Sequence, residues 1–520
     1  MLTRKVYQAL TLGIFVAGLM VAGERAFVDQ GLGPGAGAAA ALGGGFMQMV
    51  EWIVLGVADI YHAAVIAFTW FLGGLVALMQ RSGGVHGFGN AALKVANTRR
   101  KGQFAAAGIG AVFLAIDDYF HVVAAGTVFR PLTDKLRISR EKLAYIIDST
   151  AAPMVILIPI STWAGYIISE IRRASTRFDL GLSPFGTFID GIGFNFYAIL
   201  TVAFVFAIAT TRMEFGPMKK AEQRAVQEGK PLRDGAKPLI SKELTDMQVS
   251  PKANPRAINL ALPVAFLLVT AIIMLYATGH TPGASFKESM YNAFSELSLA
   301  IATLLTLLFA MTLYAFQKIM NQEEFVDTTL DGFKAMVPAL AILGLAWGIG
   351  NATEGIGLGE YVSSEIGSDM QATTVPFIAF LIAGVIAFAT GTSFGTFAIM
   401  IPISLSVVAG TDGGAQWFGA ALAATIGGAV FGDHCSPISD TTVMSSMAAQ
   451  CDHIDHVRTQ LPYAMTIAGI TATGYGMLAL TGQTWVAWAT NIFLMVAIIS
   501  LGVLFGKPAA WKAGQTVKAN

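Results

Sequence analysis

The chain contains few charged residues and only two cysteines. Charged residues make up 13% of its 520 residues, about half the share of a typical soluble domain, which excludes a soluble enzyme of the ordinary kind. Lys plus Arg and Asp plus Glu both total 33, so the net positive charge typical of nucleic-acid-binding proteins is missing. Cys435 and Cys451 are too few for a disulfide framework. No cleavable signal pattern precedes the first apolar run.

Apolar residues dominate the rest of the composition. Hydrophobic residues account for 54% of the chain, with 56 glycines and 34 phenylalanines, as expected of packed transmembrane helices. Runs long enough to cross a hydrocarbon core, about 17 to 25 residues each, lie near 7–23, 60–80, 142–171, 188–210, 257–277, 294–317, 330–350, 415–450, 461–481 and 484–505. The sequence therefore predicts an all-α polytopic membrane protein with ten crossings.

Basic residues predict the orientation of these crossings. Dense basic clusters lie at 99–101, at 130–142 and within 212–256, and all of them fall on the same side as the N-terminus. Because short cytoplasmic loops are enriched in Lys and Arg, we expect both termini in the cytoplasm and a multi-pass protein of the plasma (inner) membrane. Arg172 and Arg173 are an exception, since this topology places them outside.

Two further apolar stretches are interrupted by polar residues at their middle. The stretch 104–129 breaks at IDDYF (116–120) and is flanked by basic clusters at both ends, so both ends are expected on one side of the membrane. The stretch 375–409 breaks at TGTSFGT (390–396), and its flanks contain no Lys or Arg. We interpret both as re-entrant hairpins from opposite faces. Non-helical backbone at such depth is tolerated only where it is buried in protein or lines a polar cavity, so the tips are candidate sites.

The two halves of the chain share one plan. Similar residues recur at a near-constant offset, as with Trp70 and Trp347, which are 277 positions apart. In each half a hairpin is followed by a long broken helix, with IIDSTAAP (146–153) in the first half and FGDHCSPISD (431–440) in the second. An odd number of crossings separates the halves, which predicts inverted repeats. Inverted repeats with paired broken helices are typical of secondary transporters whose site lies near the membrane midplane.

The repeat also sets the expected domain boundaries. We expect a first inverted repeat at 1–211, a cytoplasmic linker at 212–256, a second repeat at 257–505 and a cytoplasmic tail at 506–520. The Gly- and Ala-rich segment 31–45 is expected to be a flexible or closely packed connection, and 46–59 an amphipathic stretch at the membrane interface.

Asp117 and Asp118 are the candidate site residues of the first hairpin. Each ionised carboxylate at the middle of an apolar stretch costs on the order of 2.5 to 3.5 kcal/mol, so such residues usually face a cavity. Two adjacent carboxylates can hold a hard cation or exchange it for protons. The alternative is that one of them caps a half-helix. His121, just beyond the tip, is a further candidate.

The first helix break and the second hairpin tip supply further oxygen ligands. Asp148, Ser149 and Thr150 offer a carboxylate and two hydroxyls before Pro153, a set that suits sodium, although capping around a proline kink is an alternative. The second tip has the hydroxyl side chains Thr392, Ser393 and Thr396. These could bind a cation only together with carbonyls or a carboxylate, and close helix packing by small residues is the other interpretation.

The second break has the densest polar group within the apolar part of the chain. Its candidate residues are Asp433, His434, Ser436, Ser439 and Asp440. The two carboxylates are seven residues apart and flank the stretch around Pro437. Histidine titrates near neutral pH and can carry a proton, contact a substrate or hold a neighbouring carboxylate in place.

The run CDHIDHVR (451–458) has the composition of a metal cluster. Its position at the start of an apolar helix favours capping and loop anchoring instead. We expect no metal other than transported sodium, no cofactor, and no enzyme motif such as a phosphate-binding loop.

Four motifs resemble the NhaC-type sodium/proton antiporter family. They are SREKLAYIIDSTAAP (139–153), AFATGTSFGT (387–396), FGDHCSPISDTTVMSS (431–446) and CDHIDHVRTQLPYA (451–464), and the resemblance extends from about residue 52 to 480. It implies a homodimeric, cation-coupled secondary transporter of elevator type, in which a transport domain with hairpins and broken helices slides against a scaffold. Members of this family also exchange organic acids such as malate and lactate, or import amino acids. This chain has His121 where the family tends to have Asn, and an N-terminus shorter by about two scaffold helices.

Two functions are consistent with these features. The first is sodium/proton antiport, in which Asp117, Asp118 and Asp433 alternate between proton and sodium. The second is sodium-coupled transport, such as symport, of a small amino or organic acid, with His121 or His434 setting the specificity. A channel or receptor is disfavoured, because neither requires an inverted repeat.

Overall fold

The structure is a computed structural model that describes residues 6–113, 118–159, 161–211, 213–239, 247–357 and 371–505. Its helices are α1 (Val6–Glu24), η1 (Arg25–Asp29), α2 (Pro34–Ala58), α3 (Ile60–Arg81), α4 (Gly84–Val95), α5 (Arg99–Phe113), α6 (Asp118–Lys135), α7 (Arg140–Val155), α8 (Thr162–Phe178), α9 (Pro184–Ile192), α10 (Phe196–Thr211), α11 (Gly216–Gln227), α13 (Ile258–Gly279), α14 (Phe286–Tyr291), α15 (Ser295–Phe316), α16 (Gln322–Gly355), α18 (Val375–Thr390), α19 (Ser393–Ala409), η2 (Gly414–Trp417), α20 (Phe418–Cys435), α21 (Asp440–Ala448), α22 (His453–Thr481) and α23 (Thr484–Phe505). Within these described ranges, nine helical segments are long and apolar enough to cross a membrane. The prediction of an all-α polytopic membrane protein is confirmed.

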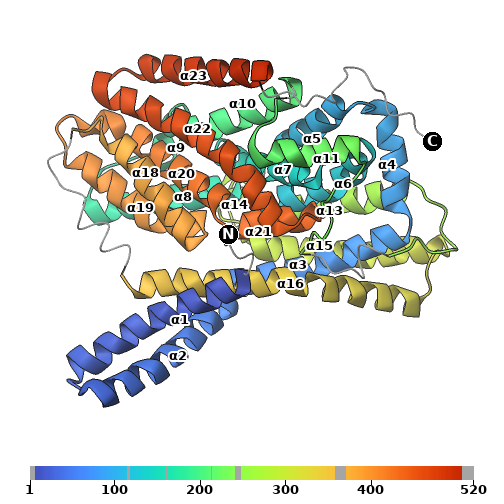
Figure 1. Cartoon of the computed structure of the whole chain (residues 1–520), viewed down its shortest axis with the longest axis horizontal. Coiled ribbons are helices and arrows are strands. Elements are labelled where there is room, and N and C mark those ends of the chain that lie inside the picture. The colour runs from blue at the N-terminus through green and yellow to red at the C-terminus, as the bar shows by residue number, and fades with distance from the viewer. Residues whose placement is uncertain are drawn as a thin grey trace.

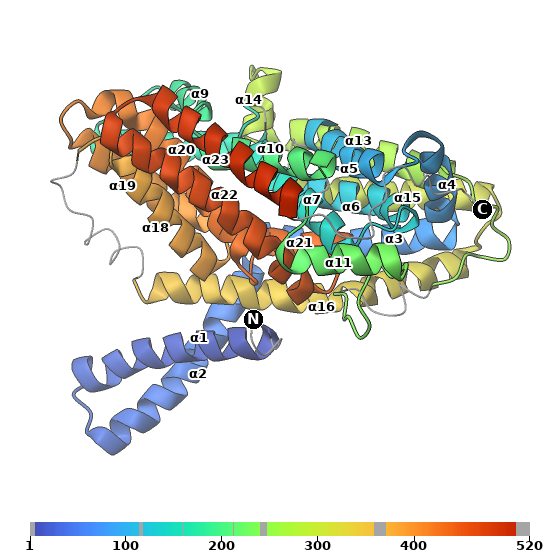
Figure 2. The same cartoon turned by 45° about the horizontal axis from the view of Figure 1, so that its top comes forward.

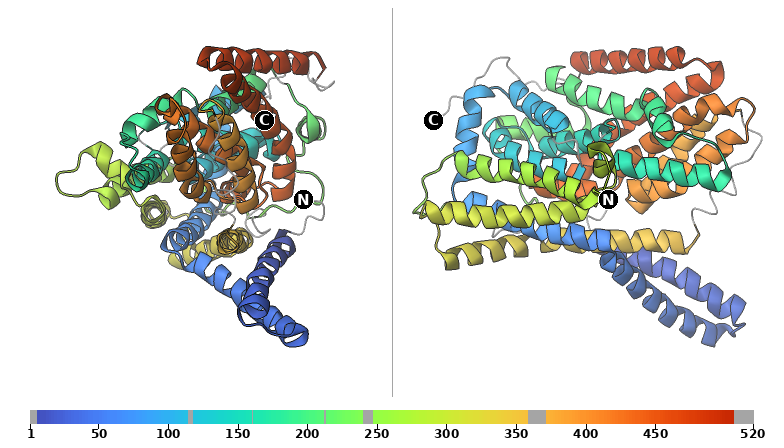
Figure 3. Two further views of the ribbon diagram at one scale, coloured as in Figure 1. Left: turned by 90° about the vertical axis from the view of Figure 1, so that its left-hand side faces the viewer. Right: turned by 180° about the vertical axis from the view of Figure 1, so that it is seen from behind.

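The helices form an elongated body from which one hairpin projects. Helices α3, α13, α15 and α16 pack on one another along one side of the body (Figure 1). The α1–α2 hairpin packs on α16 and extends away from the remaining helices (Figure 2). Helix α23 lies at the opposite side, where it packs on α22 (Figure 3). The helices that carry the predicted site residues, α6, α7, α19, α20 and α21, lie between these two borders.

The segments 31–45 and 46–59 form most of one continuous 25-residue apolar helix, α2, and of the two alternatives for 31–45 the close packing is observed. Pro34 starts this helix at a position where its missing N–H costs nothing. The glycines serve helix packing rather than flexibility: a Cβ atom on Gly18 of α1 would lie 2.5 Å from the carbonyl oxygen of Gly45. Small residues at such crossings let two apolar helices approach closely.

Each predicted hairpin contains two helices that contact each other. Helices α5 and α6 contact each other on either side of 114–117, which lies outside the described residues. Helices α18 and α19 contact each other on either side of 391–392. Gly391 ends α18 with φ +71°, a left-handed conformation that a residue without Cβ adopts at little cost.

Both predicted helix breaks exist, but the first lies further along the chain than expected. Helix α7 continues through Pro153 to Val155, and the interruption begins at Ile156. Pro159 explains the position, because the residue before a proline is disfavoured in helical conformation. Asp148, Ser149 and Thr150 are therefore helical and are not part of the break. The second break, at 436–439, lies within the predicted segment 431–440.

The predicted linker is anchored to the helices that bear the site. Its helix α11 presents Arg224, which donates to both carboxylate oxygens of Glu141 in the first turn of α7, at 2.9 and 2.8 Å. In the loop after α11, Arg233 pairs with Asp452 at 2.8 Å and with Asp455. Asp452 caps the N-terminus of α22, as the sequence predicts for this run. The linker thus fixes the starts of α7 and α22, which come from different halves of the chain.

Helix α20 crosses α18 so closely that a larger residue than Gly428 will destabilise the fold. A Cβ atom on Gly428 would lie 2.2 Å from the carbonyl oxygen of Phe380 and 2.9 Å from its carbonyl carbon. We expect Gly428→Ala to destabilise the protein by about 1 to 3 kcal/mol, because two backbones must move apart. Thermal unfolding in detergent measures this.

Gly469→Ala in α22 is the matched control, because nothing lies within 4 Å of the added Cβ atom. This variant should be neutral or slightly stabilising. Equal midpoints for Gly428→Ala and Gly469→Ala would contradict the close crossing of α18 and α20.

Candidate functional site

Asp433 lies in the last turn of α20, at the second helix break. The helix ends at Cys435, since Ser436 precedes a proline and takes an extended conformation. Helix α21 then starts with Ser439 as its N-cap, whose hydroxyl accepts from the backbone N–H of Thr442 at 3.2 Å. The break therefore brings the end of one helix and the start of the next together around Asp433.

The Asp433 carboxylate is buried and only partly satisfied by hydrogen bonds. Its Oδ2 accepts from the hydroxyl of Thr441 at 2.9 Å, and that hydroxyl is 3.0 Å from Ser439 Oγ. Its Oδ1 is buried and has no hydrogen-bond partner among the described residues. A buried polar atom without a partner is costly, so it marks a place where a ligand can contribute. The surrounding oxygens are the ligand type that hard cations prefer.

Asp440 is the second carboxylate at this break. It is half-buried in the first turn of α21, where its Oδ1 accepts from the backbone N–H of Thr441 at 2.8 Å. The carboxylates of Asp440 and Asp433 lie close enough to repel each other. A cation between or beside them would reduce that repulsion.

The remaining predicted residues of the break contact neighbouring helices. Nδ1 of the buried His434 is 3.0 Å from the hydroxyl of Tyr197 in α10. Ser436 donates its hydroxyl to the carbonyl oxygen of Phe388 in α18 at 2.9 Å. These two contacts connect the break to the neighbouring helices α10 and α18.

Asp148 links the first half of the chain to this region. It is buried in α7 and accepts from the hydroxyl of Ser445 in α21 at 2.8 Å. Its other oxygen accepts from the amide of Gln460 in α22 at 2.5 Å. The hydroxyl of Thr442 and Nε2 of His456 are each 3.4 Å from the same oxygen. Four side chains of the second half thus surround one carboxylate of the first half.

The neighbours of Asp148 in α7 make local contacts. Ser149 and Thr150 are both buried. The Thr150 hydroxyl donates to the carbonyl oxygen of Ile146 at 2.7 Å and lies 3.0 Å from Nε2 of His121 in α6. This contact joins His121 in α6 to α7.

The second hairpin tip packs directly against the second break. A Cβ atom on Gly391 would lie 2.6 Å from a side-chain carbon of Ile438. Thr392 caps α19, accepting from the N–H of Gly395 at 3.3 Å, and the Thr396 hydroxyl donates to the Thr392 carbonyl oxygen at 2.8 Å. Ser393 is buried, and its hydroxyl has no partner among the described residues.

The first hairpin reaches the second hairpin through Trp163. Asp118, the first residue of α6, accepts from the indole N–H of Trp163 at 2.7 Å. The Trp163 ring packs edge-on against Phe394 and Phe397 in the first turn of α19, with centroids 4.7 and 5.6 Å apart. Asp117 lies outside the described residues. Hydrogen bonds thus join Asp148 to α21 and α22, which follow the second break, and the hydrogen bond of Asp118 to Trp163 reaches the second hairpin through aromatic contacts.

Sequence reasoning missed Ser445, His456, Gln460 and Trp163. One signal was available: His453, His456, Gln460 and Tyr463 are spaced three or four residues apart, so they share one face of α22. No local pattern distinguishes Trp163, because its partners are far away in the sequence.

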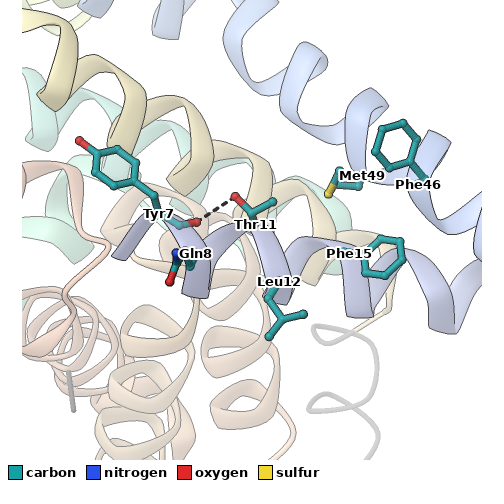
Figure 4. Close-up of a pocket in the computed structure, with 7 residues that line it drawn as sticks. All are labelled: Tyr7, Gln8, Thr11, Leu12, Phe15, Phe46 and Met49. Carbon is teal, nitrogen blue, oxygen red and sulfur yellow. Dashed lines mark hydrogen bonds between the residues drawn. The ribbon is translucent and has the colours of Figure 1, made fainter. Parts of the chain in front are cut away.

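A groove at the α1–α2 hairpin is distinct from this site (Figure 4). It has a volume of about 510 Å³ and is lined by Tyr7, Gln8, Thr11, Leu12, Phe15, Phe46 and Met49. The lining is mostly apolar and includes no charged side chain, so it lacks the carboxylates that a cation site requires.

Comparisons with known proteins place the chain among transporters. A sequence model of the Na+/H+ antiporter family matches residues 154–480. An uncharacterized protein of Haemophilus influenzae is 33% identical over 509 residues, which cover 96% of this chain and 92% of the relative. The arginine/ornithine antiporter ArcD of Halobacterium salinarum is 30% identical over 141 residues, 23% of this chain and 27% of that protein. The solved structure of Neisseria gonorrhoeae MtrF, from a class of antimetabolite efflux pumps, aligns over 89% of this chain and 84% of that chain at 11% identity, and its TM-score of 0.30 is too low to support an argument.

Proposed function

Because this chain belongs to the Na+/H+ antiporter family, we propose that it is a sodium/proton antiporter. The resemblance identified from the sequence motifs is confirmed, and the family is one of membrane transporters. The observation that carries the proposal is the buried Asp433 carboxylate, one oxygen of which has no hydrogen-bond partner among the described residues. A cation that sheds its water can satisfy this oxygen, and so can a proton.

In the proposed mechanism, sodium and protons compete for one carboxylate. Sodium binds Asp433 together with oxygens at the 436–439 break and at the second hairpin tip, where the Ser393 hydroxyl is available. Asp440 contributes negative charge beside the site. Release of sodium leaves a buried anion, whose cost favours protonation before the site returns across the membrane. This alternation produces obligatory exchange.

The architecture that we propose for this exchange is the one predicted from the sequence. The two halves act as inverted repeats, and the hairpins and broken helices move as a transport domain against a scaffold that includes α3, α13, α15 and α16. We also propose a homodimer with both termini in the cytoplasm. Asp117 and Asp118 serve the same cations from the first hairpin.

Transport of a small amino acid is the second candidate. The ArcD relative, an arginine/ornithine antiporter, supports it over the 141 matching residues. A site with Asp433 and Asp440 beside it would attract an amino group as well as sodium.

Flux measurements in proteoliposomes test the proposed function. Vesicles that contain the purified protein and are loaded with sodium should acidify inside when placed in sodium-free buffer, because sodium leaves and protons enter. An internal pH-sensitive dye measures the effect. Protein-free vesicles and potassium-loaded vesicles are the controls. Sodium-driven acidification without any organic solute supports antiport.

Uptake of labelled arginine, ornithine or organic acids by the same vesicles tests the alternative. Solute uptake without acidification in the sodium assay would reject sodium/proton antiport in favour of solute transport.

A further inference from the structure

The hydrogen bonds around Asp148 distinguish it from Asp433. An ionised carboxylate has two oxygens with about four acceptor positions. Both oxygens of Asp148 receive a donor: Ser445 donates to Oδ1 at 2.8 Å and Gln460 to Oδ2 at 2.5 Å, and Thr442 and His456 each lie 3.4 Å from Oδ2. The carboxylate of Asp433 has one donor on one oxygen and none, among the described residues, on the other. A cation ligand needs a free oxygen, and Asp148 is instead enclosed by donors.

The donors of Asp148 also hold the end of α20. The Gln460 amide carries two N–H groups, and its Nε2 is 2.5 Å from Asp148 Oδ2 and 2.9 Å from the carbonyl oxygen of His434. The Thr442 hydroxyl is likewise within 3.5 Å of the carbonyl oxygen of Asp433. Gln460 and Thr442 therefore connect Asp148 to the last turn of α20, the turn that carries Asp433.

This connection crosses between the halves of the chain. Asp148 is in α7, which the linker fixes at its start through Arg224 and Glu141. Gln460 is in α22, 312 residues further along the chain. The same linker fixes the start of α22 through Arg233. The contact is buried on both sides, with Asp148 1% exposed and Gln460 fully buried, so solvent does not weaken it.

We propose that Asp148 is a positioning residue for the cation site and does not bind the cation itself. Through Gln460 and Thr442 it fixes the carbonyl end of α20 and thereby the orientation of Asp433. This assignment replaces the sequence-based expectation that Asp148 is a sodium ligand. It rests on the proposed function, in which Asp433 binds sodium.

A double-mutant cycle tests this role. Asp148→Asn keeps the shape but turns an amide N–H group toward the donors, and Gln460→Met keeps the length but removes both N–H groups. We expect each variant to raise the sodium KM no more than about tenfold, the effect of a lost hydrogen bond. Asp148 acts on Asp433 through Gln460, so the two substitutions remove the same interaction. The sodium KM of the double variant should therefore be at most about twofold higher than that of the single variant with the higher KM. A merely structural contact would lower the yield of active protein and leave KM unchanged.

Two results would overturn the proposal. One is a sodium KM for Asp148→Asn that rises as much as for Asp433→Asn, which would make Asp148 a ligand. The other is multiplication of the two KM effects in the double variant, which would make Asp148 and Gln460 independent.

Thermal unfolding separates a failure of this proposal from a failure of the proposed function. Wild-type protein without sodium-driven exchange would reject the function alone. The melting temperatures of the same four proteins would then test whether Asp148 and Gln460 are coupled. Additive losses of stability for Asp148→Asn and Gln460→Met would reject this coupling. Thr11→Val, on α1 and outside the site, is the control for both measurements.

Discussion

Asp433→Asn is expected to lower sodium-driven proton exchange about 100-fold or more, equivalent to about 2.7 kcal/mol of lost cation binding. Asparagine keeps the size of the side chain and can still accept from the Thr441 hydroxyl. It lacks the negative charge that pairs with sodium and the acidity that exchanges a proton. Because the partnerless oxygen of Asp433 is buried, water cannot replace the lost charge. Initial rates of acidification in sodium-loaded vesicles measure the effect.

Asp331→Asn is the matched control, because it makes the same chemical change on the exposed side of α16, where Asp331 pairs with Lys334. An exposed ion pair contributes little to stability, so the exchange rate of Asp331→Asn should remain within twofold of the wild-type rate. Equal melting temperatures for Asp433→Asn and wild type would show that the lost activity is not unfolding. If Asp433→Asn kept more than a tenth of the wild-type rate, the proposed site would be wrong.

The positions of helix breaks could be predicted where the residues that cause a break are adjacent in the sequence. Polar residues together with Gly391 or Pro437 interrupt an apolar run, and the structure has a break at each place. The first break was placed too early because Pro153 looked decisive, whereas helix α7 accommodates it in its last turn and ends before Pro159. Helix α2 was missed because glycine lowers helix propensity, and the close packing against α1 that overrides this is not visible in one segment.

The site could be predicted in part for the same reason. Asp433, Ser439 and Asp440 are near one another in sequence, so a single break brings them together. The contacts of Asp148 involve residues about 300 positions away, and nothing local indicates which helix of the other half faces it. The spacing of His456 and Gln460 places them on one face of α22, but it does not identify Asp148 as their partner.

Lys142→Met is expected to destabilise the protein by about 3 to 5 kcal/mol, because it leaves a buried carboxylate without its counter-charge. Lys142 Nζ donates to Glu214 Oε1 at 2.8 Å, and the two side chains are 1% and 0% exposed. The hydroxyl of Tyr463 also contacts Glu214, and the Lys142 ammonium lies 5.4 Å from the centre of the Tyr463 ring. Thermal unfolding in detergent should show a melting temperature lower by on the order of 5 °C or more.

The double variant Lys142→Met/Glu214→Gln separates the ion pair from its surroundings. Glutamine still accepts from the Tyr463 hydroxyl, and the pair then carries no charge, so most of the lost stability should return. A double variant as unstable as Lys142→Met would mean that Lys142 acts through packing, and a stable Lys142→Met would mean that Glu214 is neutral in the fold. Because Lys142 lies on α7 and Tyr463 lies on α22, their shared contacts with Glu214 form a second connection between the two helices that carry Asp148 and Gln460. Loss of the pair should therefore also weaken the coupling between Asp148 and Gln460.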